Sequence, residues 1–255
     1  MMNHFHKFFS KQRSNNVEWT KEKVIEKLQL IENKGFIPVP DAMFRKDDGI
    51  VGQILEKEFG IKENNLHFAD LGTFELKGMR YKKNKPNKLT LFHKTSSSGL
   101  TPIQIFERFG YLKKSNRSDV MKKKLFTTIR GGKFNNLGFI LKALNENEIC
   151  LYHKDEYLAT WDLSLAKSKI DKIVLAFADT KGKTNSTDEQ FYYFKAFLLD
   201  GVKSLSQAVS DGAVVMELCI DQPADKSKVV HDRGPHIRIP IKKLSHLFEC
   251  VEEIL

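Results

Sequence analysis

The spacing of hydrophobic residues changes along this chain, and the change limits the folds that the chain can adopt. Apolar residues recur at helical spacing over Trp19–Asn33, where Thr20 can cap the first turn, and again over Gly49–Phe59. From about Thr73 onward they alternate or form short runs, which is typical of strands. Helices and strands mixed in this order predict an α/β or mixed α+β fold, with a mixed central sheet flanked by helices.

The first predicted strand, at about Thr73–Tyr81, presents Glu75 and Lys77 on one face, because side chains alternate along a strand. A short turn leads to a strand at Lys88–Lys94, so we expect the two strands to pair, as a hairpin or through a short loop. Thr101 is expected to cap a helix. Later strands are predicted at Phe126–Ile129, Phe139–Leu144, Ile149–His153, Tyr157–Trp161, Lys172–Ala178, Phe191–Leu199 and Ala213–Ile220, and helices at Leu163–Lys169, Ser204–Ser210 and, closing the chain, Lys242–Leu255.

The composition is that of a folded globular protein. Hydrophobic residues make up 41% of the 255 residues and charged residues 29%. No apolar stretch approaches the roughly 20 residues that span a bilayer, and no signal peptide is recognisable, so we expect a cytoplasmic protein without a membrane partner. Cys150, Cys219 and Cys250 form no CxxC pair, which favours reduced, buried cysteines over disulfides or a cysteine zinc site.

The basic residues are concentrated in one part of the chain. The whole chain carries a net charge of +10, from 42 Lys and Arg against 32 Asp and Glu. Between Lys77 and Lys133, 16 Lys and Arg stand against two acids, Glu107 and Asp119, so this segment carries +14 and the remainder −4. A local patch of this kind favours a bound polyanion. A solvated basic surface has the same composition and stays open as the alternative.

Three acidic residues and a lysine lie close together in the sequence. Glu56 falls in the second predicted helix, Asp70 precedes the first strand, and Glu75 and Lys77 share one face of it. Two carboxylates, Asp70 and Glu75, can hold Mg²⁺, and the Leu76 carbonyl is a further candidate ligand. Such a metal activates water for phosphodiester hydrolysis, and the lysine can orient that water and bind phosphate. The alternative is an exposed strand with an ion pair, since so short a pattern also arises by chance.

Four segments follow one another in a more selective order. They are Gly52-Gln-Ile-Leu-Glu56, Phe68-Ala-Asp70, Phe74-Glu-Leu-Lys77 and Leu89-Thr-Leu-Phe92. This order resembles the MvaI/BcnI family of restriction endonucleases, which is similar to the mismatch-repair nickase MutH and belongs to the PD-(D/E)xK nucleases. Two later segments extend the resemblance towards the C-terminus, Phe106-Glu-Arg-Phe-Gly-Tyr111 and His231-Asp-Arg-Gly234 followed by Ile237-Arg-Ile239.

The resemblance implies a monomer that uses Mg²⁺, with Mn²⁺ as a substitute, and holds double-stranded DNA in a cleft between two lobes. We expect an N-terminal arm at residues 1–18, a catalytic lobe at 19–125, and a DNA-recognition lobe at 126–255 that also completes the core. The residues that carry over as catalytic are Glu56, Asp70, Glu75 and Lys77, with Asp70, Glu75 and Leu76 as metal ligands.

Candidate DNA contacts fall into two groups. His231 and Arg238 carry over as readers of base edges, and an arginine at the latter position suits bidentate contact with guanine. Glu217-Leu-Cys219 departs from the family, which can have an arginine where Cys219 stands, so no target sequence carries over. The other expected contacts with DNA are His93, Lys94, Asp232, Arg233 and His236, and Lys113, Lys114, Arg117 and Lys122 for phosphates.

Other chemistries find little support. His231 and His236 lack a third ligand at metal-binding spacing, and the chain has neither a Gly-x-Ser-x-Gly motif nor a P-loop, so no nucleotide cofactor is expected. The aromatic run Phe191–Phe194 is interpreted as a core strand rather than a stacking platform for nucleic acid. The sequence therefore predicts a type II restriction endonuclease. A MutH-like repair nickase and a catalytically inactive, sequence-specific DNA-binding protein stay open as alternatives.

Overall fold

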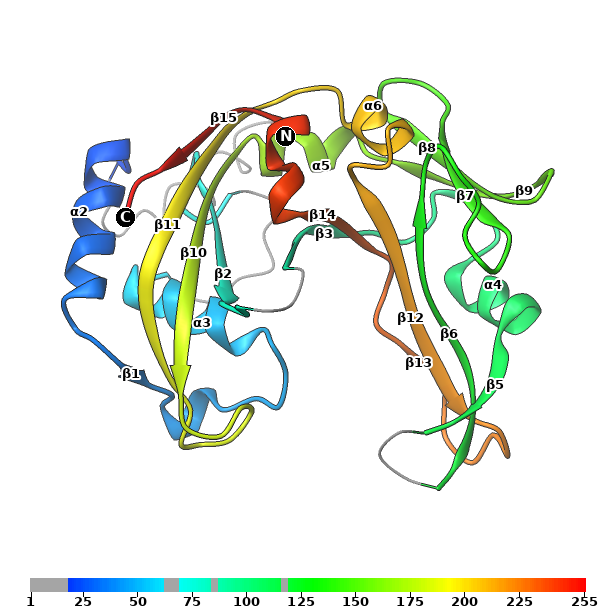
Figure 1. Ribbon diagram of the computed structural model, residues 1–255, viewed down its shortest axis with the longest axis horizontal. Coiled ribbons are helices and arrows are strands. Elements are labelled where there is room, and N and C mark those ends of the chain that lie inside the picture. The colour runs from blue at the N-terminus through cyan, green and yellow to red at the C-terminus, as the bar shows by residue number, and fades with distance from the viewer. Residues whose placement is uncertain (1–17, 62–68, 84–86, 116–118) are drawn as a thin grey trace, which may run out of the picture.

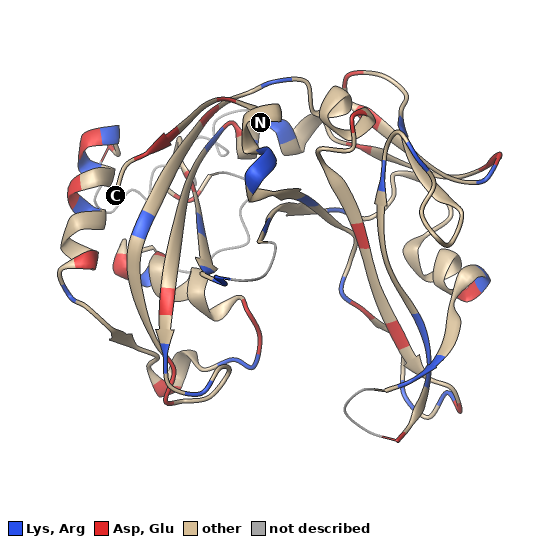
Figure 2. Ribbon diagram, viewed as in Figure 1, with Lys and Arg blue, Asp and Glu red and all other residues tan. Residues whose placement is uncertain are grey.

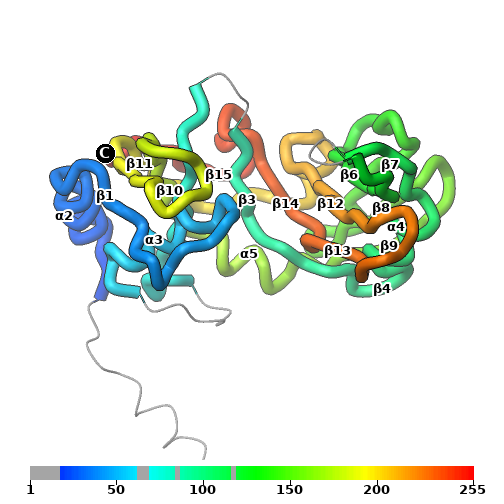
Figure 3. The backbone as a smooth tube through the Cα atoms, turned by 90° about the horizontal axis from the view of Figure 1, so that it is seen from below, coloured from blue at the N-terminus to red at the C-terminus, as the bar shows by residue number. Residues whose placement is uncertain are grey.

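The computed structural model describes residues 18–61, 69–83, 87–115 and 119–255. Arg117 and nearly all of the predicted N-terminal arm lie outside these ranges. The described chain forms three β-sheets with flanking helices, arranged as two lobes (Figure 1). Seen from below, β3 (Lys88–His93), β14 (His236–Pro240) and α5 (Ser164–Ile170) lie between the lobes (Figure 3). No helix within the described ranges is long and apolar enough to cross a membrane.

The first sheet is mixed, as the sequence predicts, and β2 lies at its edge. β2 pairs in parallel with β10, whereas β10 and β11 pair antiparallel. Helices α2 and α3 cover one face, where Leu28 and Ile54 pack against Leu76 and Tyr193 in one buried cluster. The elements of this sheet are β1 (Ile37–Pro38), β11 (Gln190–Val202), β10 (Lys172–Lys181), β2 (Glu75–Arg80) and β15 (Phe248–Glu253), with α2 (Lys21–Glu32) and α3 (Ile50–Glu58).

Helix α3 sits directly on β2 because the strand has a glycine at the contact. A Cβ atom at Gly78 would lie only 2.7 Å from the Val51 carbonyl oxygen and 3.0 Å from the Gly52 Cα. The buried Tyr193 hydroxyl donates a 2.5 Å hydrogen bond to that same Val51 carbonyl. The glycine and the tyrosine together fix the first turn of α3 against the strand that carries Glu75 and Lys77.

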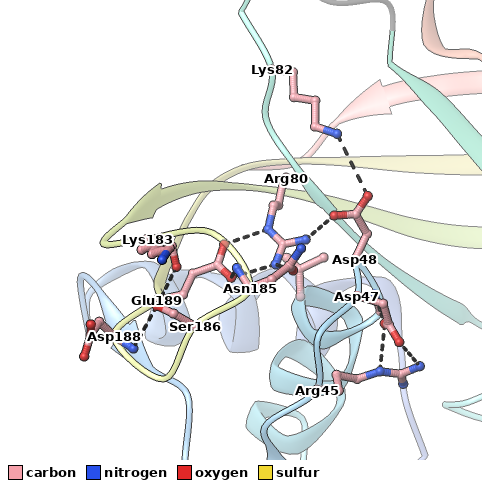
Figure 4. Close-up of polar contacts among 12 residues, drawn as sticks. Arg45, Asp47, Asp48, Arg80, Lys82, Lys183, Asn185, Ser186, Asp188 and Glu189 are labelled. Carbon is pink, nitrogen blue, oxygen red and sulfur yellow. Dashed lines mark hydrogen bonds and ion pairs between the residues drawn. The ribbon is translucent and has the colours of Figure 1, made fainter. Parts of the chain in front are cut away.

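The far end of β2 is fixed by Arg80, which is buried (Figure 4). Its guanidinium makes two parallel hydrogen bonds to Glu189, Nε to Oε1 at 2.8 Å and Nη2 to Oε2 at 2.7 Å. It also contacts Asp48, which precedes α3, and donates a 3.1 Å hydrogen bond to Asn185 in the β10–β11 loop. Three separate parts of the chain are thus held at one end of β2.

The second and third sheets form the other lobe around a shared core. Leu125, Ile129 and Leu218 of the second sheet belong to one buried cluster with Phe139 of the third sheet and Phe106 of α4. The opposite face of the second sheet carries polar residues. The second sheet contains β3, β14, β12 (Val215–Pro223), β6 (Met121–Arg130), β5 (Tyr111–Lys114) and β13 (His231–Asp232), and the third contains β4 (Ser98–Gly99), β9 (Glu156–Asp162), β8 (Glu148–His153) and β7 (Phe139–Ala143).

Two short helices pack on the second and third sheets. α4 (Pro102–Phe109) begins with a full capping box between Thr101 and Gln104, as its sequence predicts. α6 (Leu205–Ser210) is capped by Ser204. Two 3₁₀ turns, Asp41–Met43 and Ile241–His246, lie before α3 and before β15.

Three sequence expectations are wrong. β2 and β3 do not form a hairpin: β2 pairs with β10 and β3 with β14, in different sheets, because Leu89 and Leu91 of β3 are buried with Leu125 and Leu218 of the second sheet. Lys242–Leu255 is not a helix but the 3₁₀ turn followed by β15, which pairs with the exposed edge of β11. Of the three cysteines only Cys150 is buried; Cys219 is half-buried and Cys250 exposed.

The first sheet takes strands from both ends of the chain. β1 and β2 precede residue 125, whereas β10, β11 and β15 follow it. The predicted division into 19–125 and 126–255 stays a prediction about folding units. Within the described ranges, the chain crosses from the second lobe back to the first through α5 and returns after β11 (Figure 1).

Candidate active site and recognition surface

Asp70 lies beside the strand that carries Glu75 and Lys77. Its Oδ2 accepts a 2.9 Å hydrogen bond from the backbone N–H of Leu76. The N–H and C=O of one residue project to the same side of a strand. The Leu76 carbonyl therefore points to the same open edge of β2 as the Asp70 carboxylate. This edge gathers two of the candidate metal ligands, Asp70 and Leu76, with Glu75 next to them in sequence.

Glu75 is almost completely buried, with 2% of its surface exposed. Its Oε1 lies 2.5 Å from the Lys77 Nζ, while its Oε2 is buried and has no hydrogen-bond partner among the residues that the structure describes. Burial raises the pKa of Glu75; Lys77 opposes this, and the nearby Asp70 carboxylate adds to it. A buried carboxylate oxygen without a partner is costly unless it has a ligand. This oxygen is therefore a candidate ligand for a cation.

A second lysine, which the sequence did not point to, lies at the same carboxylate. The Nζ of Lys169, in the last turn of α5, is 3.6 Å from Glu75 Oε1. Both ammonium groups therefore face Oε1. No local pattern could have revealed Lys169, because 94 residues separate it from Glu75 in the sequence.

Glu56 lies on the other side of β2 from the Glu75 side chain. α3 packs on the face that contains Leu76 and Gly78, and strand alternation turns Glu75 and Lys77 to the opposite face. Glu56 is half-buried, one turn beyond Gly52. The structure thus brings Asp70, Glu75 and Lys77 together, and the catalytic role of Glu56 stays a prediction.

The free face of the second sheet gathers many of the predicted DNA contacts. Arg238 donates hydrogen bonds from Nη1 to Glu217 at 2.6 Å and from Nε to Thr90 Oγ1 at 3.0 Å. Glu217 also contacts Lys88, and these partners outweigh burial and lower its pKa. Arg238 is therefore held in a fixed orientation by an acid that sequence reasoning noted but gave no role.

His93 and His236 also lie on this free face, with ring centroids 4.3 Å apart. A bulge where β3 pairs with β14 places Phe92 opposite Ile237 and Thr90 opposite Arg238. The extra residue changes the alternation, so that Thr90 and His93 share a face although three positions apart. Burial, followed by the positive charges of His93 and Arg238, lowers the pKa of His236 to about 4.

The predicted phosphate contacts occupy both faces of the β5–β6 hairpin. Lys113 pairs in register with Lys122, so both face the same side, and Lys122 makes a 2.6 Å ion pair with Asp221. Lys114 lies on the opposite face and pairs with Asp119. Figure 2 shows basic residues along β5 and β6 and acidic positions on the neighbouring β12.

The segment from His231 to Gly234 lies beside β12. His231 is exposed and pairs in register with Asp221, and Arg233 lies over the ring of Phe126 at 5.9 Å. Asp232 stabilises the turn of this segment, because its Oδ1 accepts a 2.8 Å hydrogen bond from the Gly234 N–H. Lys94, after β3, accepts a hydrogen bond from the Trp161 indole through its backbone carbonyl.

No group of three or more His, Cys, Asp or Glu side chains in the described ranges is arranged to hold a metal. The oxygen donors at the edge of β2 instead comprise two carboxylates and a backbone carbonyl. Mg²⁺ is commonly bound by one or two carboxylates while keeping several waters, so this small donor set suits it.

Comparison with known proteins settles the family. The sequence model described as the MvaI/BcnI restriction endonuclease family matches residues 25–248. The chain belongs to this family. It is therefore a DNA-cleaving endonuclease of the restriction type. No curated protein sequence matches the chain.

Two solved structures are similar to this member of the family. The complex of restriction endonuclease MvaI with its cognate DNA substrate aligns with a TM-score of 0.72 and 19% identity, over 93% of this chain and 100% of that one. MvaI in the absence of DNA aligns with a TM-score of 0.48 and 18% identity, over 93% and 99%. The first match shows that the two proteins share a fold.

Proposed function

We propose that the protein is a type II restriction endonuclease that hydrolyses phosphodiester bonds of double-stranded DNA at a short specific site, with Mg²⁺ as cofactor and Mn²⁺ as a substitute. The observation that carries the proposal is the Glu75 carboxylate: Oε1 faces two ammonium groups, and Oε2 is buried with no partner in the described part of the chain. Asp70 is held at the adjoining strand edge. We also propose that the enzyme is a cytoplasmic monomer that cuts the two strands in succession.

The proposed ligands are the carboxylates of Asp70 and Glu75 and the carbonyl of Leu76. A divalent ion bound there supplies an activated water and neutralises negative charge on the phosphate. The hydrogen bond from Leu76 N–H orients the Asp70 carboxylate, and Lys77 and Lys169 balance the charge of two neighbouring acids. We also propose that Glu56 binds water molecules at the free edge of β2, next to the proposed metal ligands.

Lys77 is proposed to orient the attacking water and to contact the scissile phosphate. An ammonium has three donors, so the hydrogen bond to Glu75 leaves two for water and phosphate. The buried side of Glu75 excludes bulk water, which strengthens each of these electrostatic interactions.

DNA specificity is assigned to the free face of the second sheet. Arg238, held by Glu217 and Thr90, is proposed to read a base, together with His231, His93 and His236. Lys94, Lys113, Lys114, Arg117, Lys122 and Arg233 are proposed to contact phosphates, with Asp232 shaping the loop.

Cleavage of phage DNA with Mg²⁺, followed by sequencing of the fragment ends, would identify both the site and the cut position. Asp70→Asn keeps an oxygen that can accept the Leu76 hydrogen bond but removes the charge. We expect it to abolish cleavage and to keep DNA binding. Asp155→Ala, at an exposed turn, is the matched control. Full cleavage by Asp70→Asn would refute the proposed active site.

The same assay on supercoiled plasmid separates the alternatives. A restriction enzyme gives linear DNA with a transient nicked form, whereas a MutH-like nickase stops at the nicked form. An inactive DNA-binding protein leaves the plasmid supercoiled under every metal condition.

A further inference from the structure

The free face of the second sheet ends in a cavity that lies outside the residues so far assigned to DNA recognition. It has a volume of about 470 Å³ and is bounded by β5, β6 and the loop that follows β6. Its wall joins the recognition surface through one side chain, because the Phe126 ring that lines it also lies 5.9 Å beneath the Arg233 guanidinium. The other charged and aromatic lining residues are Tyr111, Arg130, Lys133 and Phe134.

The loop that bounds this cavity is held rigidly. The Asn135 side chain makes four hydrogen bonds: Nδ2 donates to Thr127 Oγ1 and the Thr128 carbonyl, and Oδ1 accepts from the N–H groups of Leu137 and Phe139. A Cβ at Gly131 would lie 2.2 Å from the Val209 carbonyl, so the loop packs directly on the end of α6. The cavity is therefore formed before any ligand arrives, which lowers the entropic cost of binding.

The lining combines flat apolar rings with positive charge. Phe134 is 50% exposed and Phe126 40%, although both are large aromatic residues. Arg130 and Lys133 are exposed beside them, and Lys124 lies 5.9 Å from the Phe126 ring. Glu217 contacts Thr128 of this wall and is already paired with Lys88 and Arg238. A ligand that suits these groups has an anionic part and an adjoining flat or apolar part.

We propose that this cavity binds one nucleotide unit of the DNA backbone beyond the recognised base pairs. The phosphate lies on Arg130 and Lys133, and the sugar packs against the rings of Phe134 and Phe126. The inference rests on the proposed function, since it extends the recognition surface past Arg233 along the same strand of bound DNA. Its role is affinity and placement of the duplex rather than the reading of sequence.

The test compares two duplexes centred on the site that the fragment-end experiment identifies, about 10 and about 25 base pairs long, or roughly one and two and a half helical turns. Binding is measured with Ca²⁺ in place of Mg²⁺. For the wild type we expect tighter binding of the long duplex. Phe134→Ala and Arg130→Gln should weaken binding of the long duplex by about fivefold to tenfold and leave the short one unchanged.

The salt dependence of DNA binding is an independent test of the proposed phosphate contact. Between about 50 and 200 mM salt, Arg130→Gln should lower the slope of log affinity against log salt by about one for the long duplex, and Phe134→Ala should leave it unchanged. Leu144→Ala and Lys154→Gln change exposed residues of the same lobe and are matched controls expected to have no effect.

The inference is overturned if both variants bind the long duplex like the wild type, or if they weaken both duplexes equally. If either of these results is obtained and the wild type still cuts the site with Mg²⁺, the inference fails and the proposed function stands. If the wild type neither binds nor cuts either duplex, the proposed function fails and takes the inference with it.

Discussion

Replacing Arg80 tests how the active-site strand is fixed in place. The side chains of Arg80 and Glu189 are 6% and 1% exposed, and the guanidinium fork meets the carboxylate at 2.7 and 2.8 Å. Arg80→Met keeps much of the apolar stem and removes the charge. Glu189 then stays buried as a charged group, with one remaining hydrogen bond from the Asn185 N–H.

The expected cost follows from that unpaired charge. Removing one partner of a buried ion pair costs about 3–5 kcal/mol, because the other partner stays desolvated. At roughly 2–4 °C per kcal/mol for a chain of this size, the melting temperature should fall by about 10 °C. Arg45→Met is the matched control, since its pair with Asp47 is exposed and contributes at most about 1 kcal/mol.

Urea denaturation of the single and double variants measures the coupling directly. Arg80→Met combined with Glu189→Gln removes the charge on both sides, so the double variant should recover a large part of the stability lost by the arginine change alone. If Arg80→Met costs no more than Arg45→Met, or if Glu189→Gln gives no recovery, the buried pair does not fix β2 and the reasoning is refuted.

Three further outcomes are expected. The pKa of His236 in the folded protein is about 4, below its ordinary value of 6.5, so its contribution to stability is complete above pH 6.5 and is lost as the pH falls towards 4. The loss reaches at most about 3 kcal/mol. His236→Gln should flatten the pH dependence of thermal melting across that range. Lys169→Met should lower kcat by about tenfold or more without weakening DNA binding in Ca²⁺. Lys167→Met changes an exposed lysine on the same helix and should leave kcat and DNA affinity unchanged. If the two variants change kcat equally, Lys169 has no role at Glu75. Gly78→Ala should destabilise the protein by about 1–3 kcal/mol in urea, because the added Cβ meets the backbone of α3 at 2.7 Å, and unchanged stability would show that the helix can move away.

The sequence predicted most of the secondary structure correctly, because helix caps and strand alternation depend on residues that are close in sequence. Thr20 caps α2 as expected, and Thr101 and Gln104 close the capping box of α4. Alternation along β2 turns Glu75 and Lys77 to one face, and Phe191 and Tyr193 are buried in the core as predicted. These features depend on residues within a few positions of each other.

The errors concern pairing between distant segments, which spacing alone does not encode. The apolar residues near the C-terminus suit one face of a helix, yet the unpaired edge of β11 offered backbone partners and the segment became β15. β3 follows β2 closely in sequence, but its Leu89 and Leu91 are buried in the other lobe. Likewise nothing in the sequence linked Lys169 with Glu75.

The two lobes are joined through the element that carries Lys169. α5 follows directly from β9 of the third sheet and leads into β10, the strand paired with β2. Leu163 before the helix and Ile170 at its end are both buried in the core that the lobes share. Lys169 therefore contacts Glu75 from the segment of chain that joins the third sheet to the first. A shift of α5 relative to β2 would therefore change the charge around the Glu75 carboxylate.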